Sequence, residues 1–386
     1  MESNYRTLIF YVKAHGELAR KIVYTAERWR EAFERGLDML KQLNHYPSQK
    51  EINKLCYNIA KEVTGCSYYA TTVCRELHEL VKSCKALKVK LQDVKLRNWL
   101  MIESKGDCKH RGNGGIHLDS LTQCTLFLLD EGKKRVEKVT ITNVKPPRSS
   151  RFRAIAEELI ELANEGKVSY NTRLYILGIA LNAAYAQLQV SVPYELYMKY
   201  AKRVDKVIPL NKVKYVLGFD INSDNIAWCL VDQYGNVIEW DIIDFRRFRT
   251  QGVSGKVCRT YVMEQLHILF TRFVINEELE LAVGVEKREV LCALKLAWIK
   301  SGERKGVHYN YWVSIFRPRI MDDIEQIACK YGVHVIPVEP RGTSSSEEHR
   351  EVMKKLRVNR HVASAYLVAL RALAQLKQRK NIQTYP

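Results

Sequence analysis

Two acidic residues stand where an apolar stretch of the sequence ends, and both are candidates for binding a metal ion. Asp220 follows the run 213–219, and Glu286 closes the run 279–285. An acidic residue at a strand end often serves only solvation or turn formation, and that explanation stays open for either residue alone. Together, the two carboxylates offer the oxygen ligands that Mg²⁺ prefers. The sequence therefore predicts part of a magnesium site at the ends of two neighbouring strands.

The residues after Asp220 predict a three-stranded meander. A second apolar run at 225–231 is followed by turn residues at 234–236 and a third run at 237–240. Apolar runs separated by turn residues are typical of antiparallel strands. Further elements are expected around Glu286, namely helices at 262–273 and 315–331, a strand at 333–338 and a final helix at 346–377. We expect residues 212–386 to form one α/β domain.

The first part of the chain has a different organisation. Residues 5–12 predict a strand, after which the apolar residues step by three and four as on one face of a helix: Ile22, Ala26, Trp29, Phe33, Leu37 and Leu40. Ser48 and Glu51 have the spacing of a helix capping box. Strand-like stretches return after residue 90. We expect a β-barrel domain of residues 1–15 and 90–205, interrupted by a helical lobe of residues 16–89.

Several motifs resemble those of the TnpB-type (OrfB-type) proteins of insertion sequences, which are RNA-guided DNA nucleases related to the type V Cas effectors. The motifs are Gly218-Phe219-Asp220, Val285-Glu286, Pro340-Arg341-Gly342-Thr343-Ser344 and Arg360-His361-Val362-Ala363-Ser364-Ala365. The resemblance covers the chain from about residue 213 onward and is weaker upstream. It implies a C-terminal RuvC-type, RNase-H-like domain, and an N-terminal wedge-type barrel with an inserted recognition lobe. It also implies Asp220, Glu286 and His361 as catalytic residues and metal ligands.

The sequence departs from that family in two places. No Cys-x-x-Cys pair follows the Thr-Ser motif, so the family's zinc ribbon is missing and we expect no structural zinc. His361 occupies the position of the family's last catalytic Asp, and Ser364 stands where some related nucleases carry an Asp one helical turn later. Hydrolysis with two metals requires enough ligands for both ions, and imidazole suits Mn²⁺ better than Mg²⁺. We expect Mg²⁺ or Mn²⁺ as the cofactor, and whether the site cuts stays open.

The charge of the chain points to a polyanionic partner. Its 386 residues carry 62 Lys and Arg against 43 Asp and Glu, a net charge of +19 spread along the sequence. A basic run closes the helical lobe, a second follows Glu286, and one Arg precedes His361. The candidate phosphate-binding residues are Lys82, Lys85, Lys88, Lys90, Arg288, Lys295 and Arg360. A solvated surface explains such runs as well. The expected partners are a guide RNA and a DNA target.

Neither a membrane nor a zinc site is indicated. The first residues lack the pattern of a secretory signal, and no stretch of eighteen apolar residues occurs, so we expect a prokaryotic cytoplasmic protein acting on the nucleoid. Cys108, His110, His117 and Cys124 could in principle hold zinc, but their spacing fits no common pattern. The oligomeric state is not indicated by the sequence.

Three functions fit these observations. The leading hypothesis is an insertion-sequence-encoded, RNA-guided DNA endonuclease with a two-metal site at Asp220, Glu286 and His361. The first alternative is an RNA-guided DNA-binding protein that no longer cuts, which the altered residues His361 and Ser364 favour. The second alternative is a guide-independent, structure-selective DNA nuclease, for which the helical lobe is larger than needed.

Overall fold

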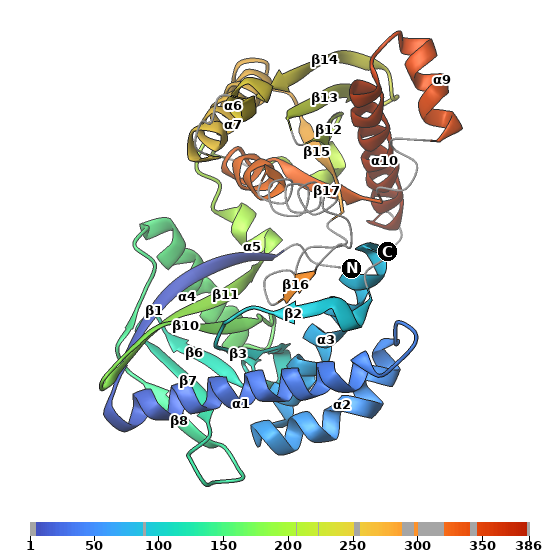
Figure 1. The fold of residues 1–386 in the computed structure, drawn as a ribbon. Coiled ribbons are helices and arrows are strands. Elements are labelled where there is room, and N and C mark those ends of the chain that lie inside the picture. The colour runs from blue at the N-terminus through green and yellow to red at the C-terminus, as the bar shows by residue number, and fades with distance from the viewer. Residues whose placement is uncertain are drawn as a thin grey trace. The chain divides into compact units, whose positions relative to one another are not determined.

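The computed structural model describes residues 5–87, 90–205, 207–222, 224–250, 255–287, 297–299, 320–339 and 346–383. The chain divides into two compact units (Figure 1). Unit 1 comprises Met1–Tyr197 and Val290–Ser301, and unit 2 comprises Met198–Glu289 and Gly302–Pro386. The segment 290–301, which the sequence placed within the C-terminal domain, is thus grouped with unit 1. Its described strand β16 (Ala297–Ile299) pairs with β2 (Val94–Leu96) of that unit.

The main sheet of unit 1 is antiparallel and built on a long N-terminal strand. Its order is β3-β10-β11-β1-β9, with bounds β1 Tyr5–His15, β3 Met101–Ser104, β9 Val144–Lys145, β10 Thr172–Ala180 and β11 Ala183–Pro193. Side chains alternate along β1, because Leu8 and Phe10 are buried whereas Ile9 and Tyr11 are exposed. This alternation gives the sheet one face toward the core of unit 1.

Three helices follow β1, as the apolar spacing predicted: α1 Gly16–Lys41, α2 Gln49–Thr64 and α3 Ser67–Leu87. The stepped apolar residues of α1 are buried, and the rings of Trp29 and Phe33 stack with their centroids 5.9 Å apart. The predicted capping box is confirmed at α2, where Ser48 and Glu51 exchange hydrogen bonds. The predicted apolar face of α1 and the predicted helix start at Ser48 are therefore confirmed.

The rest of unit 1 consists of a second sheet, short strand pairs and two helices. The second sheet has the order β6-β7-β8, with bounds Ile116–Ser120, Gln123–Leu128 and Glu137–Ile141. The smaller elements are β4 Gly106–Asp107, β5 Gly112–Asn113, α4 Ser150–Asn164 and α5 Tyr194–Lys199. Within the described ranges these strands belong to separate sheets, so a single barrel stays a prediction.

Unit 2 contains the mixed sheet that carries the candidate site. Its order is β14-β13-β12-β15-β17, with bounds β12 Tyr215–Ile221, β13 Asn225–Asp232, β14 Val237–Asp244, β15 Leu281–Glu286 and β17 His334–Val338. The first three strands form the predicted antiparallel meander, whereas β12, β15 and β17 run parallel. Unit 2 is therefore a mixed α/β unit.

Two faces of this sheet are covered by different helices (Figure 1). Ala227 and Cys229 of β13 pack in one hydrophobic cluster with α10, which spans Arg360–Gln383. Trp228, whose side chain points to the other face, contacts Phe273 in the π-helical turn Thr271–Asn276 that follows α7 (Gly255–Phe270). Residues 320–330 are also helical, and α6 spans Arg246–Thr250.

Glycines in two neighbouring strands let α10 approach the sheet closely. A Cβ atom on Gly218 would lie 2.2 Å from the carbonyl oxygen of Ala365, and one on Gly284 would lie 2.9 Å from the Cβ of Ala372. Distances this short exclude any side chain at either position. The glycines of β12 and β15 therefore determine how α10 crosses the sheet.

The predicted single final helix is wrong, because the structure has two helices there. Helix α9 (Glu347–Leu356) ends at Arg357, which adopts a left-handed conformation with φ 52°. Asn359 then begins α10, since its side-chain oxygen accepts hydrogen bonds from the backbone N–H groups of His361 and Val362 at 2.9 and 3.0 Å. Across the described residues, no helix has the length and apolar character needed to span a membrane.

Candidate metal and nucleic-acid site

Asp220 and Glu286 lie at the same edge of the sheet in unit 2. Gly218 of β12 pairs in parallel register with Gly284 of β15, so each acidic residue comes two positions after a paired glycine. Side chains two positions apart in a strand share a face, and both glycines face α10. Asp220 and Glu286 are therefore level with each other, on the face that α10 covers.

His361, in the first turn of α10, reaches this edge. Its Nδ1 atom lies 3.1 Å from Oδ2 of Asp220. Asn222 links the two, because its side-chain nitrogen donates to Oδ2 of Asp220 at 2.8 Å and lies 3.0 Å from Nδ1 of His361. Asp220, Asn222 and His361 thus form one polar cluster, although 139 residues separate the amide from the imidazole in sequence.

The protons of this cluster allow two arrangements. With Nδ1 of His361 unprotonated, the ring accepts a hydrogen bond from Asn222; with Nδ1 protonated, the ring donates to Asp220. Among the described residues, Asp220 makes no ion pair with Lys or Arg and has only His361 as a titratable partner. A buried carboxylate with 6% exposure and no fixed cation is suited to accept one from solution.

The side chains of Asp220, Glu286 and His361 are of the types that bind a divalent metal ion, but they do not converge on one point. Carboxylate oxygens suit Mg²⁺ and Mn²⁺, and the imidazole favours Mn²⁺. Over the described ranges, no three His, Cys, Asp or Glu side chains gather closely enough to hold one metal ion. The structure therefore brings Asp220 and His361 together and places Glu286 at the same sheet edge without joining it to their cluster.

Ser364 does not face this cluster. It is 2% exposed, and its Oγ atom donates to the carbonyl oxygen of Arg360 at 3.0 Å and lies 3.2 Å from Nε2 of His349 in α9. The same imidazole nitrogen lies 2.8 Å from the Arg360 carbonyl oxygen. Ser364 therefore links α10 to α9, which gives it a structural role.

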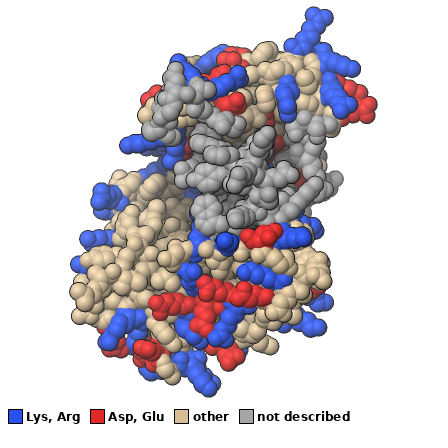
Figure 2. All heavy atoms as spheres, viewed as in Figure 1, with Lys and Arg blue, Asp and Glu red and all other residues tan. Residues whose placement is uncertain are grey.

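The predicted phosphate-binding residues are only partly within the described chain. Lys82 is exposed and pairs with Glu79 at 3.2 Å, and Lys85 on α3, Lys90 and Arg360 are also exposed. Three of the predicted residues lie outside the described residues: Lys88, Arg288 and Lys295. Figure 2 shows Lys and Arg side chains scattered over both units on the face that it draws, which agrees with charge spread along the sequence.

The four residues considered for zinc do not assemble into a site in the described structure. Cys124 is buried in β7, where burial raises the pKa of its thiol to about 12. Cys108 is exposed, and His110 accepts or donates a hydrogen bond with Asp107 at 2.8 Å. A thiol held protonated is a poor metal ligand, since zinc binds the thiolate.

Two site residues were missed from the sequence. Asn222 comes two positions after Asp220 and on a strand would share its face, which is a signal for a polar neighbour. Asn359 precedes the apolar periodicity of α10, as helix N-caps do. Neither residue type is diagnostic alone, because Asn is equally common in turns.

The described chain consists of two units, and the C-terminal unit is a mixed α/β unit with the polar cluster at one edge of its sheet. The chain belongs to the family described as the SSO2105 N-terminal domain, whose model matches residues 8–202. That match spans most of unit 1 and ends close to the boundary with unit 2.

Relatives were found in two archaea. A protein of Aeropyrum pernix named "Uncharacterized protein" is 26% identical over 379 residues, covering 96% of this chain and 97% of its own. "Uncharacterized protein SSO2105" of Saccharolobus solfataricus is 27% identical over 205 residues, covering 50% of each chain. The first relative therefore matches both units.

One solved structure also matches part of the chain. It is "T. thermophilus RuvC in complex with Holliday junction substrate", with a TM-score of 0.28, 14% identity and coverage of 43% of this chain and 95% of that chain. A TM-score this low supports no statement about fold or function.

Proposed function

We propose that unit 2 is a divalent-metal-dependent nuclease that hydrolyses DNA, with Asp220, Glu286 and His361 as its metal-binding residues. The observation that carries this proposal is the register of β12 and β15. It brings both acidic residues to the same edge of the sheet, which the first turn of α10 reaches with the imidazole of His361. Asp220 is buried, and its partners among the described residues are the neutral amide of Asn222 and the imidazole of His361.

Each residue has a defined part in the proposed site. Asn222 and His361 both contact Oδ2 of Asp220, which fixes the carboxylate and leaves Oδ1 free to turn toward a cation. A bound divalent ion would supply an activated water molecule and stabilise the leaving oxygen of the phosphodiester. Asn359 caps the first turn of α10 by accepting a hydrogen bond from the backbone N–H of His361. This bond helps to hold His361 close to Asp220.

We further propose that a guide RNA directs this cleavage to its DNA target. Support comes from the order of the motifs that resemble TnpB-type proteins, from Gly218-Phe219-Asp220 to Arg360-His361. In such a system the guide would read sequence by base pairing, while the protein would contact the backbone of the duplex. A basic chain of net charge +19 suits both an RNA and a DNA partner.

Cleavage of end-labelled single-stranded DNA tests the proposal. The protein would be assayed with its co-purified RNA in Mg²⁺ and in Mn²⁺, beside Asp220→Asn and Glu286→Gln. Glu280→Gln is the matched control, because Glu280 directly precedes β15, at the end away from Glu286, and pairs with Lys214 at 2.7 Å.

We expect both site variants to lose at least about 100-fold in rate and the control to keep the wild-type rate. Cleavage that survives in both site variants would contradict the proposal. No cleavage by the wild type in either metal, with DNA binding intact, would replace it with a binding function.

A further inference from the structure

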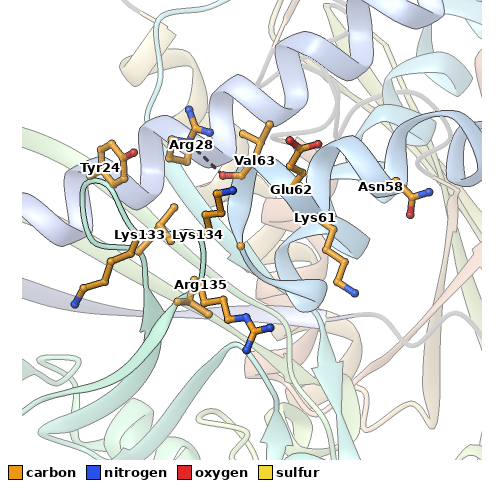
Figure 3. A pocket seen from close by; sticks show the side chains of 12 residues that line it. Tyr24, Arg28, Asn58, Lys61, Glu62, Val63, Lys133, Lys134 and Arg135 are labelled. Atoms are coloured by element: carbon orange, nitrogen blue, oxygen red, sulfur yellow. Dashed lines mark hydrogen bonds between the residues drawn. The ribbon is translucent and has the colours of Figure 1, made fainter.

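A basic groove lies in unit 1, formed by the outer face of α2 and the loop between β7 and β8. Its larger hollow has a volume of about 860 Å³ and is lined by Lys61 of α2 and by Lys134 and Arg135 of the loop. A second hollow of about 530 Å³ continues along α2, and Asn58 lines both. Figure 3 shows Asn58 and Lys61 on one side of the larger hollow and Lys133, Lys134 and Arg135 on the other.

The positive charge of the groove is only partly neutralised by the protein. Arg28 pairs with Glu31, and Lys133 pairs with Asp130 at 3.0 Å. The remaining cations have no ion-pair partner within the described part of the chain: Lys54, Lys61, Lys134 and Arg135. Glu62 is the acidic residue that faces them in the larger hollow. The groove therefore has an excess of cations available to an anionic ligand.

Close packing fixes the two sides of the groove against each other. Gly65 caps α2 in a left-handed conformation with φ 63°, and a Cβ atom there would lie 2.8 Å from the carbonyl oxygen of Lys134. At the base of the loop, Lys21 of α1 pairs with Glu137 and lies 3.8 Å from Asp130. The loop that carries Lys134 and Arg135 is thus held at the end of α2, opposite Lys61.

Aromatic rings lie among these cations. Tyr57 lines the second hollow and shares a face of α2 with Lys54 and Lys61, three positions after one and four before the other. Tyr24 of α1 lines the larger hollow. Neither ring stacks on another aromatic residue of the described chain. Cations that follow a groove, interleaved with available rings, are the elements with which proteins bind unpaired nucleic-acid strands.

We propose that this groove binds a single strand of nucleic acid. Lys54, Lys61, Lys134 and Arg135 contact its phosphates, and a base stacks on Tyr57. Only unpaired bases expose the faces that a tyrosine ring can cover, so the groove selects a single strand over a duplex. This binding goes beyond the proposed cleavage, since the groove belongs entirely to unit 1 and needs no metal.

Fluorescence anisotropy with labelled strands of about 15 nucleotides tests this proposal. EDTA is present so that no cleavage occurs, and the ligands are oligo-U, oligo-dT and a duplex of equal length. The groove variant is Lys61→Gln, Lys134→Gln and Arg135→Gln combined. The control variant, Lys13→Gln, Lys105→Gln and Lys145→Gln combined, removes the same charge from exposed positions of unit 1 outside the groove and outside α2.

We expect the groove variant to lose at least about 10-fold in affinity for the single strand, with the salt dependence reduced by roughly two to three ions. The control should change by less than about 3-fold. Tyr57→Ala should weaken single-strand binding by about 5-fold or more, whereas Tyr57→Phe should retain it. Tighter binding of oligo-U or of oligo-dT identifies the strand as RNA or DNA, and either result supports the proposal.

Equal losses in the groove and control variants would overturn the proposal, as would duplex binding as tight as single-strand binding. Because EDTA is present, the outcome of this assay does not depend on a metal ion bound in unit 2. A failure of the nuclease proposal would therefore leave this result unchanged, and the two proposals can be rejected separately.

Discussion

Each unit of the molecule has a buried acidic site, and the two sites differ in what surrounds the carboxylates. In unit 1, Glu76 of α3 and Glu103 of β3 are 3% and 1% exposed. Arg173 donates to Glu76 at 2.9 Å and to Glu103 at 2.8 Å. In unit 2, Asp220 is also buried, but its partners are the amide of Asn222 and the imidazole of His361.

The difference indicates how a buried acid can be assigned a role. Glu76 and Glu103 are held by Arg173 and also contact Arg75, so their charge is balanced within the protein. No described Lys or Arg pairs with Asp220, so a cation from solution can balance it. Burial of an acid is therefore compatible with either role, and the charge of its partners distinguishes a structural cluster from a candidate metal site.

The largest expected effect is on the stability of unit 1. Arg173→Met should lower the free energy of unfolding by about 4 kcal/mol, because two buried carboxylates lose a shared cation. Lys214→Met, which removes the partner of the more exposed Glu280, should cost less than about 1 kcal/mol. Urea unfolding followed by circular dichroism measures both. A similar loss of unfolding free energy in the two variants would show that Arg173 stabilises its buried carboxylates no more than Lys214 stabilises the more exposed Glu280.

Replacing Gly218 in unit 2 should lower both the stability of the protein and the activity of the candidate metal site. Gly218→Ala should cost about 3 kcal/mol and reduce DNA cleavage, because the new methyl group meets the backbone of α10 and moves His361 away from Asp220. Gly178→Ala is the control, since a Cβ atom there meets nothing within 4 Å. Thermal unfolding and cleavage rates would be compared. Normal cleavage by Gly218→Ala would contradict the role given to the close approach of α10.

The acid pair of unit 1 should show a distinctive pH dependence. Burial, with the nearby charge of Glu103, raises the pKa of Glu76 from 4.5 to about 7, against the opposing effect of Arg173 and Arg75. The folded state therefore holds a proton that the unfolded state releases, and stability should fall as pH rises from about 5 to 7. In Glu76→Gln this loss is absent, so its stability relative to the wild type should rise by on the order of 2 kcal/mol between pH 5 and pH 8.

Urea unfolding at several pH values checks this prediction. Glu51→Gln is the control, because hydrogen bonds from Ser48 lower the pKa of Glu51 to about 2. The stability difference between that variant and the wild type should be constant above pH 5. A constant difference for Glu76→Gln as well would refute the raised pKa.

The smallest expected effect on stability comes from removing a helix N-cap, and two such caps can be compared. Asn359→Ala and Ser48→Ala should each cost about 1 kcal/mol, because each removes a side-chain acceptor at a helix N-terminus. Only Asn359→Ala should also reduce cleavage, since Asn359 holds the backbone of His361. Equal cleavage by the two variants would show that the position of His361 does not depend on its cap.

Much of the local structure was predictable from the sequence. The stepped apolar residues of α1 and the Ser48–Glu51 capping box were predicted and are confirmed, because both depend on contacts within one helix. The meander after Asp220 was also predicted, since its strands are joined by short turns. Local interactions of this kind are encoded within a few residues of one another.

The features that were not predicted from the sequence depend on backbone conformation or on contacts between distant segments. Helix α9 is separated from α10 by Arg357, which has a left-handed backbone conformation. An Arg in the sequence does not predict that conformation. The pairing of Asn222 with His361, the inward position of Ser364 and the basic groove all arise from packing between separate elements. Asp220 and Glu286 were visible in the sequence because each closes an apolar run, and His361 because its motif resembles that of TnpB-type proteins.

The binding of Mn²⁺ tests the proposed metal site most directly. Titration followed by electron paramagnetic resonance would compare the wild type with Asp220→Asn, Glu286→Gln, His361→Ala and the control Glu280→Gln. We expect Mn²⁺ to bind the wild type and the control, each of the other variants to lose at least about 10-fold in affinity, and Mn²⁺ to bind more tightly than Mg²⁺. Binding of Mn²⁺ that is equal in all five proteins, or absent from the wild type, would contradict the proposed site.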